Sequence, residues 1–131
     1  KVEELKLKDR VKFLGFRSNI PQLMSACDLI THTSTAPEPF GRVIIEAMLC
    51  GKPVIAANAG GAAEIIEHDK TGWLTPPGDA HQLSEMICQC HDSPEHTSAV
   101  AQAAKEYATQ QFNLLRINQD IDRLLNQVIN N

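Results

Sequence analysis

The sequence predicts an α/β fold, a Rossmann-like parallel sheet with flanking helices. Short apolar runs of strand length alternate with helical stretches in the first part of the chain, a pattern typical of parallel sheets. Residues 53–57 are almost continuously apolar, as expected of a strand covered by helices on both faces. A chain of 131 residues is long enough for one domain with a modest core.

Four strands are expected, each a short apolar run bounded by glycine or polar residues. The first run ends at Gly15 and a polar loop, and the last begins at Gly72. The strands cover residues 11–16, 28–33, 53–57 and 72–75. Ligands of such sheets bind beyond the carboxyl ends of the strands, so the loops there are the first candidates for a site.

Three helices are expected between these strands. Asn19 is a good N-cap for the first, which carries Pro21 in its first turn. The second has apolar side chains at helical spacing and ends at Gly51, and the third follows Gly60 and Gly61. They cover residues 20–26, 41–50 and 62–67.

The rest of the chain is expected to be helical. Asp79 caps a long helix with Gln82 at the capping-box position, and a Ser-Pro step ends that helix. Residues 95–111 and 114–129 form two more helices. The last is amphipathic with an acidic polar face, which favours packing on a missing domain over membrane contact. Residues 1–8 look like the end of a helix that begins upstream, so a fragment of a longer protein is expected.

Composition excludes several classes of function. The net charge of -4 argues against a nucleic-acid-binding surface. No apolar run reaches about 18 residues, and no signal-peptide pattern is present, so neither a membrane span nor secretion is expected. The cysteine spacing fits neither a zinc site nor a redox pair, which indicates reduced thiols in a cytosolic protein. The cysteines are Cys27, Cys50, Cys88 and Cys90.

The segment between Glu38 and Glu46 is the strongest candidate for a site. The two carboxylates stand eight positions apart and bracket a Pro-Phe-Gly turn at the start of an apolar helix. Such a turn frees backbone N–H groups at a helix N-terminus, which suits a phosphate. Carboxylates on either side can accept hydrogen bonds from the hydroxyls of a sugar and of a ribose. The segment therefore predicts a nucleotide-sugar site.

An ordered series of short motifs closely resembles the C-terminal domain of retaining GT-B glycosyltransferases of family four, the glycosyl transferases group 1. The family includes sucrose-synthase-like and glycogen-synthase-like enzymes. The resemblance covers roughly residues 1–90. Its motifs lie at residues 11–15, 26–28, 38–41 with 46–48, 51–56, 60–64 and 72–74.

The resemblance implies a donor site for a nucleoside-diphosphate sugar, with Glu38 as the catalytic-site carboxylate that contacts the sugar hydroxyls. Glu46 would accept the ribose hydroxyls. The remaining donor-binding residues would act through their backbones. Phe40, Gly41 and Arg42 would hold the sugar and the distal phosphate, and Phe16 and Arg17 would meet the base.

The resemblance also implies what lies outside the chain. This chain has no counterpart of the family's N-terminal acceptor domain. It also lacks the two earlier strands of the donor domain, which carry the cations that bind the diphosphate. Residues 1–131 are therefore expected to be a partial donor-binding domain, with a core over 1–78 and C-terminal helices over 79–131. In the family strand order 3-2-1-4-5-6, the strand over 11–16 would lack a neighbour. It is expected to pair with another chain, as a strand-exchanged homodimer, or to re-dock beside residues 28–33. The isolated chain is expected to be inactive.

The expected activity is retaining transfer of a sugar to an acceptor hydroxyl, with no metal and no cofactor. The acceptor is left open between a saccharide, a lipid and a small molecule, and the location is expected to be cytoplasmic, or peripheral to the membrane in the full-length protein. Two alternatives remain: a non-catalytic nucleotide-sugar-binding module, and a GT-B-type sugar-nucleotide epimerase that needs no acceptor.

Structural interpretations compete with the functional ones. If the segment bound no ligand, Glu38 would be an acid in a surface loop, Glu46 a carboxylate on the solvent-exposed face of a helix, and Gly41 the residue that starts that helix. For these three residues the functional interpretation is preferred. The side chain of Arg42 is expected to be a solvated cation.

The structural interpretation is preferred at the other positions. Gly60 and Gly61, with Glu64, fit turn and helix chemistry, His32 fits a satisfied packing role, and Trp73 fits a core anchor under the last helices. The remaining histidines form no metal-ligand spacing; they are His68, His81, His91 and His96.

Overall fold

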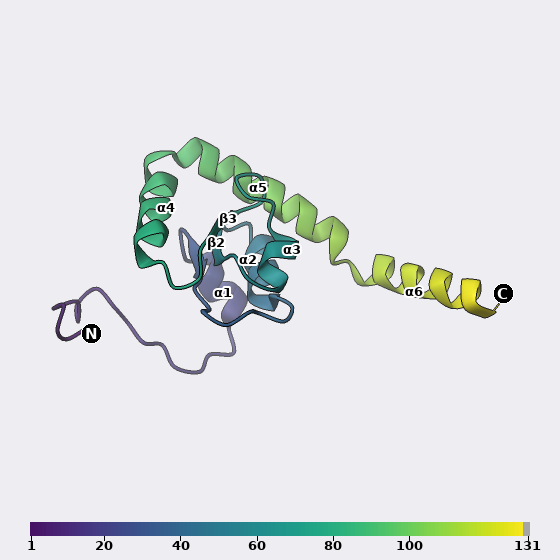
Figure 1. Ribbon diagram of the computed structural model, residues 1–131, viewed down its shortest axis with the longest axis horizontal. Helices are drawn as coiled ribbons and strands as arrows, with labels where there is room; N and C mark the ends of the chain where they lie inside the picture. The colour runs from purple at the N-terminus through teal and green to yellow at the C-terminus, as the bar shows by residue number, and fades with distance from the viewer. Residues whose placement is uncertain (130–131) are drawn as a thin grey trace.

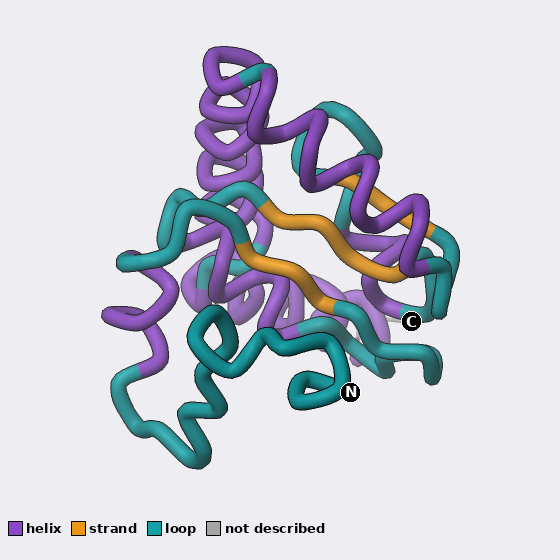
Figure 2. The backbone as a smooth tube through the Cα atoms, turned by 90° about the vertical axis from the view of Figure 1, so that its left-hand side faces the viewer, coloured by secondary structure: helices purple, strands orange, loops and turns teal. Residues whose placement is uncertain are grey.

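The structure is a computed structural model that describes residues 1–129. Its sheet has three parallel strands, β1 (Ile30–His32), β2 (Val54–Ala57) and β3 (Trp73–Thr75), in the order β1-β2-β3. Figure 2 shows the strands side by side with helices around them. The register places Ile30 opposite Val54 and Ile55 opposite Trp73. The predicted parallel α/β sheet is confirmed.

The described part of the chain has six helices. They are α1 (Ile20–Ser25), α2 (Arg42–Leu49), α3 (Gly61–Ile65), α4 (Ala80–Asp92), α5 (Pro94–Gln111) and α6 (Leu114–Ile129). The predicted N-cap of α4 is confirmed, because the Asp79 carboxylate accepts from the backbone N–H of Gln82 at 3.0 Å. The reciprocal bond of a capping box is not formed: the Gln82 side-chain amide also donates to that carboxylate, at 3.1 Å, and the Asp79 N–H donates to the carbonyl oxygen of Pro76. Asn19 occupies the N-cap position of α1, as predicted, but its side chain makes no capping hydrogen bond.

The central strand β2 divides the core into two apolar clusters. Val54 and Ala56 face one cluster with α2 and α3, and Ile55 faces the other with Trp73 and α4. Alternate residues of one strand point to opposite faces, so helices cover the sheet on both sides. Helix α5 contributes to both clusters and packs along α2. This arrangement explains why β2 is buried at all four positions.

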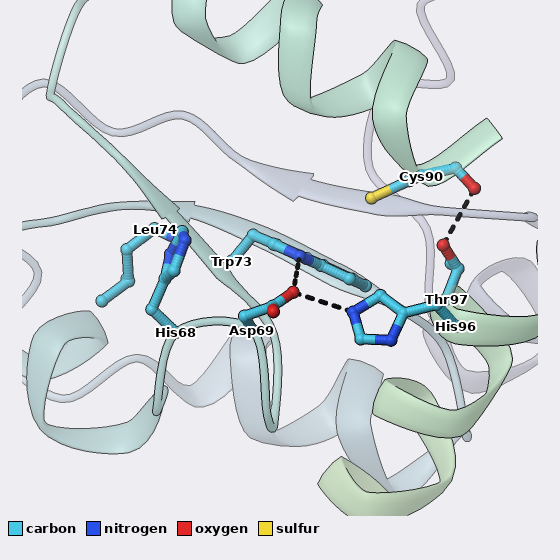
Figure 3. Close-up of polar contacts among 7 residues, drawn as sticks. All are labelled: His68, Asp69, Trp73, Leu74, Cys90, His96 and Thr97. Carbon is cyan, nitrogen blue, oxygen red and sulfur yellow. Dashed lines mark hydrogen bonds and ion pairs between the residues drawn. The ribbon is translucent and has the colours of Figure 1, made fainter. Parts of the chain in front are cut away.

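Trp73 anchors the start of β3 under α4 and α5, as the sequence predicts, and it is 1% exposed. Its ring nitrogen donates to Asp69 Oδ1 at 3.1 Å, and the same oxygen lies 2.8 Å from Nε2 of His96 on α5 (Figure 3). The hydrogen bond from His96, and then that from Trp73, lowers the pKa of Asp69. The cluster thus joins the turn before β3 to α5.

The predicted first strand is wrong. Residues 11–16 form no strand, and Phe13 and Phe16 are 84% and 96% exposed. A strand is stable only beside a neighbour that pairs its backbone groups, and among residues 1–129 β1 pairs with β2 alone. Re-docking beside residues 28–33 is therefore wrong as well. Pairing with a second chain stays a prediction.

The two ends of the described chain lie away from the core. Residues 1–8 form turns instead of the expected helical tail, and Lys6 adopts a positive φ of 54°. Figure 1 shows α6 projecting beyond α5. None of the described residues of α6 is buried, so packing of its apolar stripe on a further domain stays a prediction.

Candidate functional site

The candidate site lies at the carboxyl ends of β1 and β2, where the two following loops meet. Glu38, in the loop after β1, forms an isolated parallel bridge with Gly60, in the loop after β2. The N–H of Gly61 donates to the carbonyl oxygen of Glu38 at 2.7 Å. A backbone hydrogen bond of this length fixes the position of one loop against the other. The site is therefore built from segments about 20 residues apart in sequence.

The glycine pair is required by this close approach. A Cβ atom at Gly60 would stand 2.3 Å from the carbonyl oxygen of Glu38, and one at Gly61 would stand 2.5 Å from that of Phe40. Gly60 also has a φ of +58°, which favours glycine. Packing of the two loops is therefore sufficient to explain why both positions are glycine. Contact of the pair with a ligand stays a prediction.

The carboxylate of Glu38 is approached by protein groups from two sides. The N–H of Gly41 donates to Oε1 at 3.4 Å, and Nε2 of His32 lies 3.6 Å from Oε2. The Glu38 side chain is 33% exposed, so its oxygens remain open to solvent. A carboxylate with about four acceptor sites and two protein neighbours keeps room for hydroxyl donors.

His32 ends β1 and is packed, as expected, but it is not satisfied. Its side chain is 14% exposed, and its Nδ1 is buried with no hydrogen-bond partner among the described residues. The other ring nitrogen faces Glu38. The sequence places the two residues six positions apart, but only the return of the intervening loop brings their side chains together.

Gly41 turns the chain into α2. It occupies the N-cap position with a φ of 89°, and a Cβ there would stand 2.9 Å from Cδ1 of Ile65. Its carbonyl oxygen accepts the first N–H groups of the ladder, from Ile44 and Ile45. The N–H groups at the start of a helix have no intrahelical acceptor and carry the positive end of the dipole. The start of α2 can therefore receive a negatively charged group.

Glu46 lies one turn into α2 and is 40% exposed. Nη2 of Arg42 lies 3.4 Å from its Oε1, and the Arg42 side chain is 79% exposed, so that guanidinium is solvated as expected. An exposed pair of this kind contributes little to stability and is easily opened. Four helical residues span about 6 Å, so Glu46 stands a short distance along the helix from its N-terminus.

Five of the seven predicted site residues lie on one continuous segment of the chain, and the other two lie on an earlier segment. The segment carries Glu38, Phe40, Gly41, Arg42 and Glu46. Phe40 is 55% exposed and meets the ring of Phe112, at the end of α5, edge-on at 6.3 Å.

Phe16 and Arg17 are exposed in the segment before α1. A backbone contact of these two residues with a base stays a prediction.

A hollow of about 130 Å³ lies at the carboxyl ends of all three strands, next to these loops. Thr33, Ala57 and Thr75 line it from the strand ends, and Gly78 and Asp79 line it from the start of α4. This is the edge at which open α/β sheets bind ligands.

The described residues show neither a metal centre nor a membrane span. Over 1–129, no three or more His, Cys, Asp or Glu side chains are grouped so as to hold a metal ion. No helix in that range is both long and apolar enough to cross a bilayer. All four cysteines have free thiols, and burial raises the pKa of Cys90.

Comparison with known proteins identifies similar chains. The family model for glycosyl transferases group 1 matches residues 1–107. The N-acetyl-alpha-D-glucosaminyl L-malate synthase of Bacillus anthracis is 36% identical over 111 residues, which cover 85% of this chain and 29% of that protein.

Two solved structures have the same fold as this chain. Anabaena Alr3699/HepE in complex with UDP-glucose is 55% identical with a TM-score of 0.91, over 96% of this chain and 35% of that one. The sucrose-phosphate synthase of Thermosynechococcus elongatus is 34% identical with a TM-score of 0.88, over 98% of this chain and 32% of that one. The chain thus spans about a third of the length of these relatives.

Proposed function

The chain belongs to the glycosyl transferases group 1 family as part of a C-terminal-type GT-B domain, and on this premise we propose that it binds the nucleoside-diphosphate sugar from which the whole enzyme transfers a glycosyl group. The observation that carries the proposal is the placement of Glu38 and Glu46 on either side of the turn that begins α2, at the ligand-binding edge of the sheet.

Each part of the donor has a chemical counterpart in this segment. Glu38 accepts hydrogen bonds from hydroxyls of the sugar, and Glu46 accepts hydrogen bonds from the two hydroxyls of the ribose. The N–H groups at the start of α2, around Phe40, Gly41 and Arg42, meet the distal phosphate. The contact from Gly41 N–H to Glu38 is 3.4 Å, long enough to be exchanged for a phosphate oxygen.

A UDP-sugar is the first candidate for the donor. Anabaena Alr3699/HepE, 55% identical over 96% of this chain, is solved with UDP-glucose. Since the start of α2 can meet any nucleoside diphosphate, selection between bases falls to other groups, and we assign it to the backbone at Phe16 and Arg17.

The proposed chemistry is transfer of a sugar to an acceptor hydroxyl with retention of configuration. Cleavage of the bond between the anomeric carbon and the diphosphate leaves negative charge on the departing oxygens. Preorganised N–H donors stabilise such charge, and we assign this task to the start of α2 together with cations elsewhere in the whole protein, without a metal ion.

The acceptor hydroxyl belongs to a saccharide, a lipid or a small molecule and is bound outside this chain. A cytoplasmic location is part of the same proposal, and the four free thiols are consistent with it.

Ligand-observed saturation-transfer NMR on the whole protein tests the proposal. UDP-glucose, GDP-mannose and ADP-glucose are compared, and saturation of the ribose and sugar protons of UDP-glucose is expected. Assays with and without an acceptor then separate a transferase from an epimerase or a binding module. If none of the three ligands receives saturation, the donor-binding proposal is wrong.

A further inference from the structure

The ring of His32 is held in a place that packing alone does not explain. It stands at the end of β1 with 14% of its side chain exposed, and its Nδ1 is buried without a partner among the described residues. A buried polar atom that is not hydrogen-bonded lowers stability. An aliphatic side chain of similar size would fill the same space without that penalty. The imidazole is therefore expected to serve another group.

Glu38 is the group that the ring can serve. Nε2 of His32 lies 3.6 Å from Oε2 of Glu38, somewhat longer than a hydrogen bond. The terminal torsion of a glutamate is broad, so rotation of the carboxylate can bring Oε2 closer to Nε2. The tautomer with its hydrogen on Nε2 suits both observations, because it donates to Glu38 and leaves only a lone pair on the buried Nδ1.

Two protein donors approach the Glu38 carboxylate before the nucleotide-sugar binds. Gly41 N–H approaches Oε1 at 3.4 Å, from the start of α2, and His32 approaches Oε2 from the end of β1. Each oxygen keeps a second acceptor position. When the Gly41 N–H turns to the phosphate, His32 is the protein donor that still holds the carboxylate plane for a pair of neighbouring sugar hydroxyls.

We propose that His32 is a positioning residue, whose Nε2–H orients the Glu38 carboxylate toward the sugar hydroxyls of the donor. The inference rests on the proposed function, because it assumes that Glu38 contacts the sugar. In this proposal His32 acts on the donor only through Glu38. Its contribution is therefore confined to the sugar half of the ligand and does not extend to the nucleotide.

The matched substitutions His32→Gln and His32→Asn test the proposal in the whole protein. The amide nitrogen of glutamine lies near the position of Nε2 and can donate to Glu38, whereas the shorter asparagine reaches only the position of Nδ1. A third variant, His32→Leu, removes both ring nitrogens. Titration calorimetry gives the dissociation constants for UDP-glucose and for UDP with each variant.

The expected readout is the ratio of the two dissociation constants. His32→Asn and His32→Leu are expected to bind UDP-glucose roughly three- to tenfold more weakly, the equivalent of one hydrogen bond, while UDP binding is unchanged. His32→Gln keeps the wild-type ratio. His32→Leu is also expected to unfold at an equal or higher temperature, because it removes the unpaired Nδ1. A residue with only a structural role would not change the ratio.

Two results overturn the proposal. Equal losses for UDP and UDP-glucose would show a general disturbance of the site, and an unchanged ratio in both His32→Asn and His32→Leu would show that the ring does not act on Glu38.

Failure of the proposed function is distinguishable from either result, because wild-type protein would then bind neither ligand. A double variant with Glu38→Ala, which removes the acceptor of the His32 N–H, gives a further check. Once Glu38 is changed, His32→Leu should have no additional effect on UDP-glucose binding.

Discussion

The N–H of Gly61 donates to the carbonyl oxygen of Glu38 at 2.7 Å, and this bond joins the loops that follow two neighbouring strands. The proposed sugar-binding carboxylate therefore stands on a backbone that a second loop holds in place. The position of Glu38 depends on β2 as well as on β1.

Gly60→Ala is expected to disturb the site and the fold together. The new Cβ would stand 2.3 Å from the Glu38 carbonyl oxygen, so one of the two loops must move, at an expected loss of about 1–3 kcal/mol in the free energy of unfolding. Urea denaturation measures that loss, and titration with UDP-glucose measures the effect on binding.

Gly15→Ala is the matched control for this substitution. Gly15 has a similar φ of +63°, but a Cβ there meets no atom within 4 Å, so the variant carries the backbone cost without a collision. Equal destabilisation by the two substitutions would contradict the account of the loop contact.

Trp73→Ala is expected to remove about 3–5 kcal/mol from the free energy of unfolding, because this large side chain is 1% exposed between the sheet and two helices. Trp73→Phe keeps most of the apolar contact but removes the donor to Asp69, so a smaller loss of about 1–2 kcal/mol is expected. Denaturant unfolding followed by circular dichroism compares the two variants. A similar loss in both would argue against the packing contribution.

Stability is expected to fall in acid through Asp69. Hydrogen bonds from His96 and Trp73 lower its folded pKa below the ordinary value of an aspartate. A carboxyl with a lowered pKa stabilises the fold above its unfolded value, and this contribution is lost as the pH falls through the folded pKa. The melting temperature should therefore decline below about pH 4, and less steeply in Asp69→Asn.

Asp79 contributes in the same direction, because its hydrogen bonds from Gln82 also lower its pKa, so some acid sensitivity remains in the Asp69→Asn variant. Identical melting profiles for wild type and Asp69→Asn between pH 2 and 6 would contradict the contribution of Asp69.

Arg42→Gln is expected to leave donor binding within about threefold of wild type, because the account assigns the phosphate contact to backbone N–H groups and the side chain is 79% exposed. Stability should change by less than about 1 kcal/mol, as for other exposed ion pairs. Calorimetric titration with UDP measures the first effect. A loss of a hundredfold would instead assign the phosphate contact to the guanidinium.

The elements that the sequence predicts well are those determined by local chemistry. Asp79 caps the start of α4, and α2 ends beside Gly51, because both depend on residues within a few positions. The central strand is predicted equally well, since a short apolar run flanked by glycine and proline is typical of a buried strand. The segment from Glu38 to Glu46 is recognisable for the same reason.

The features that the sequence does not predict depend on partners far along the chain. Residues 11–16 have the composition of a strand, but a strand also needs a neighbour, and within residues 1–129 β1 pairs only with β2. The proximity of His32 to Glu38 arises from the path of a loop that follows no periodic pattern. The collision that excludes a side chain at Gly60 is visible only once two loops are placed together.

The central claim is that Glu38 and Glu46 bind different halves of a nucleotide-sugar. Titration calorimetry of UDP and UDP-glucose with Glu38→Gln and Glu46→Gln in the whole protein tests it most directly. Glu46→Gln is expected to weaken the binding of both ligands roughly tenfold or more, whereas Glu38→Gln is expected to weaken the binding of UDP-glucose alone. Unchanged binding of both ligands by both variants would contradict it.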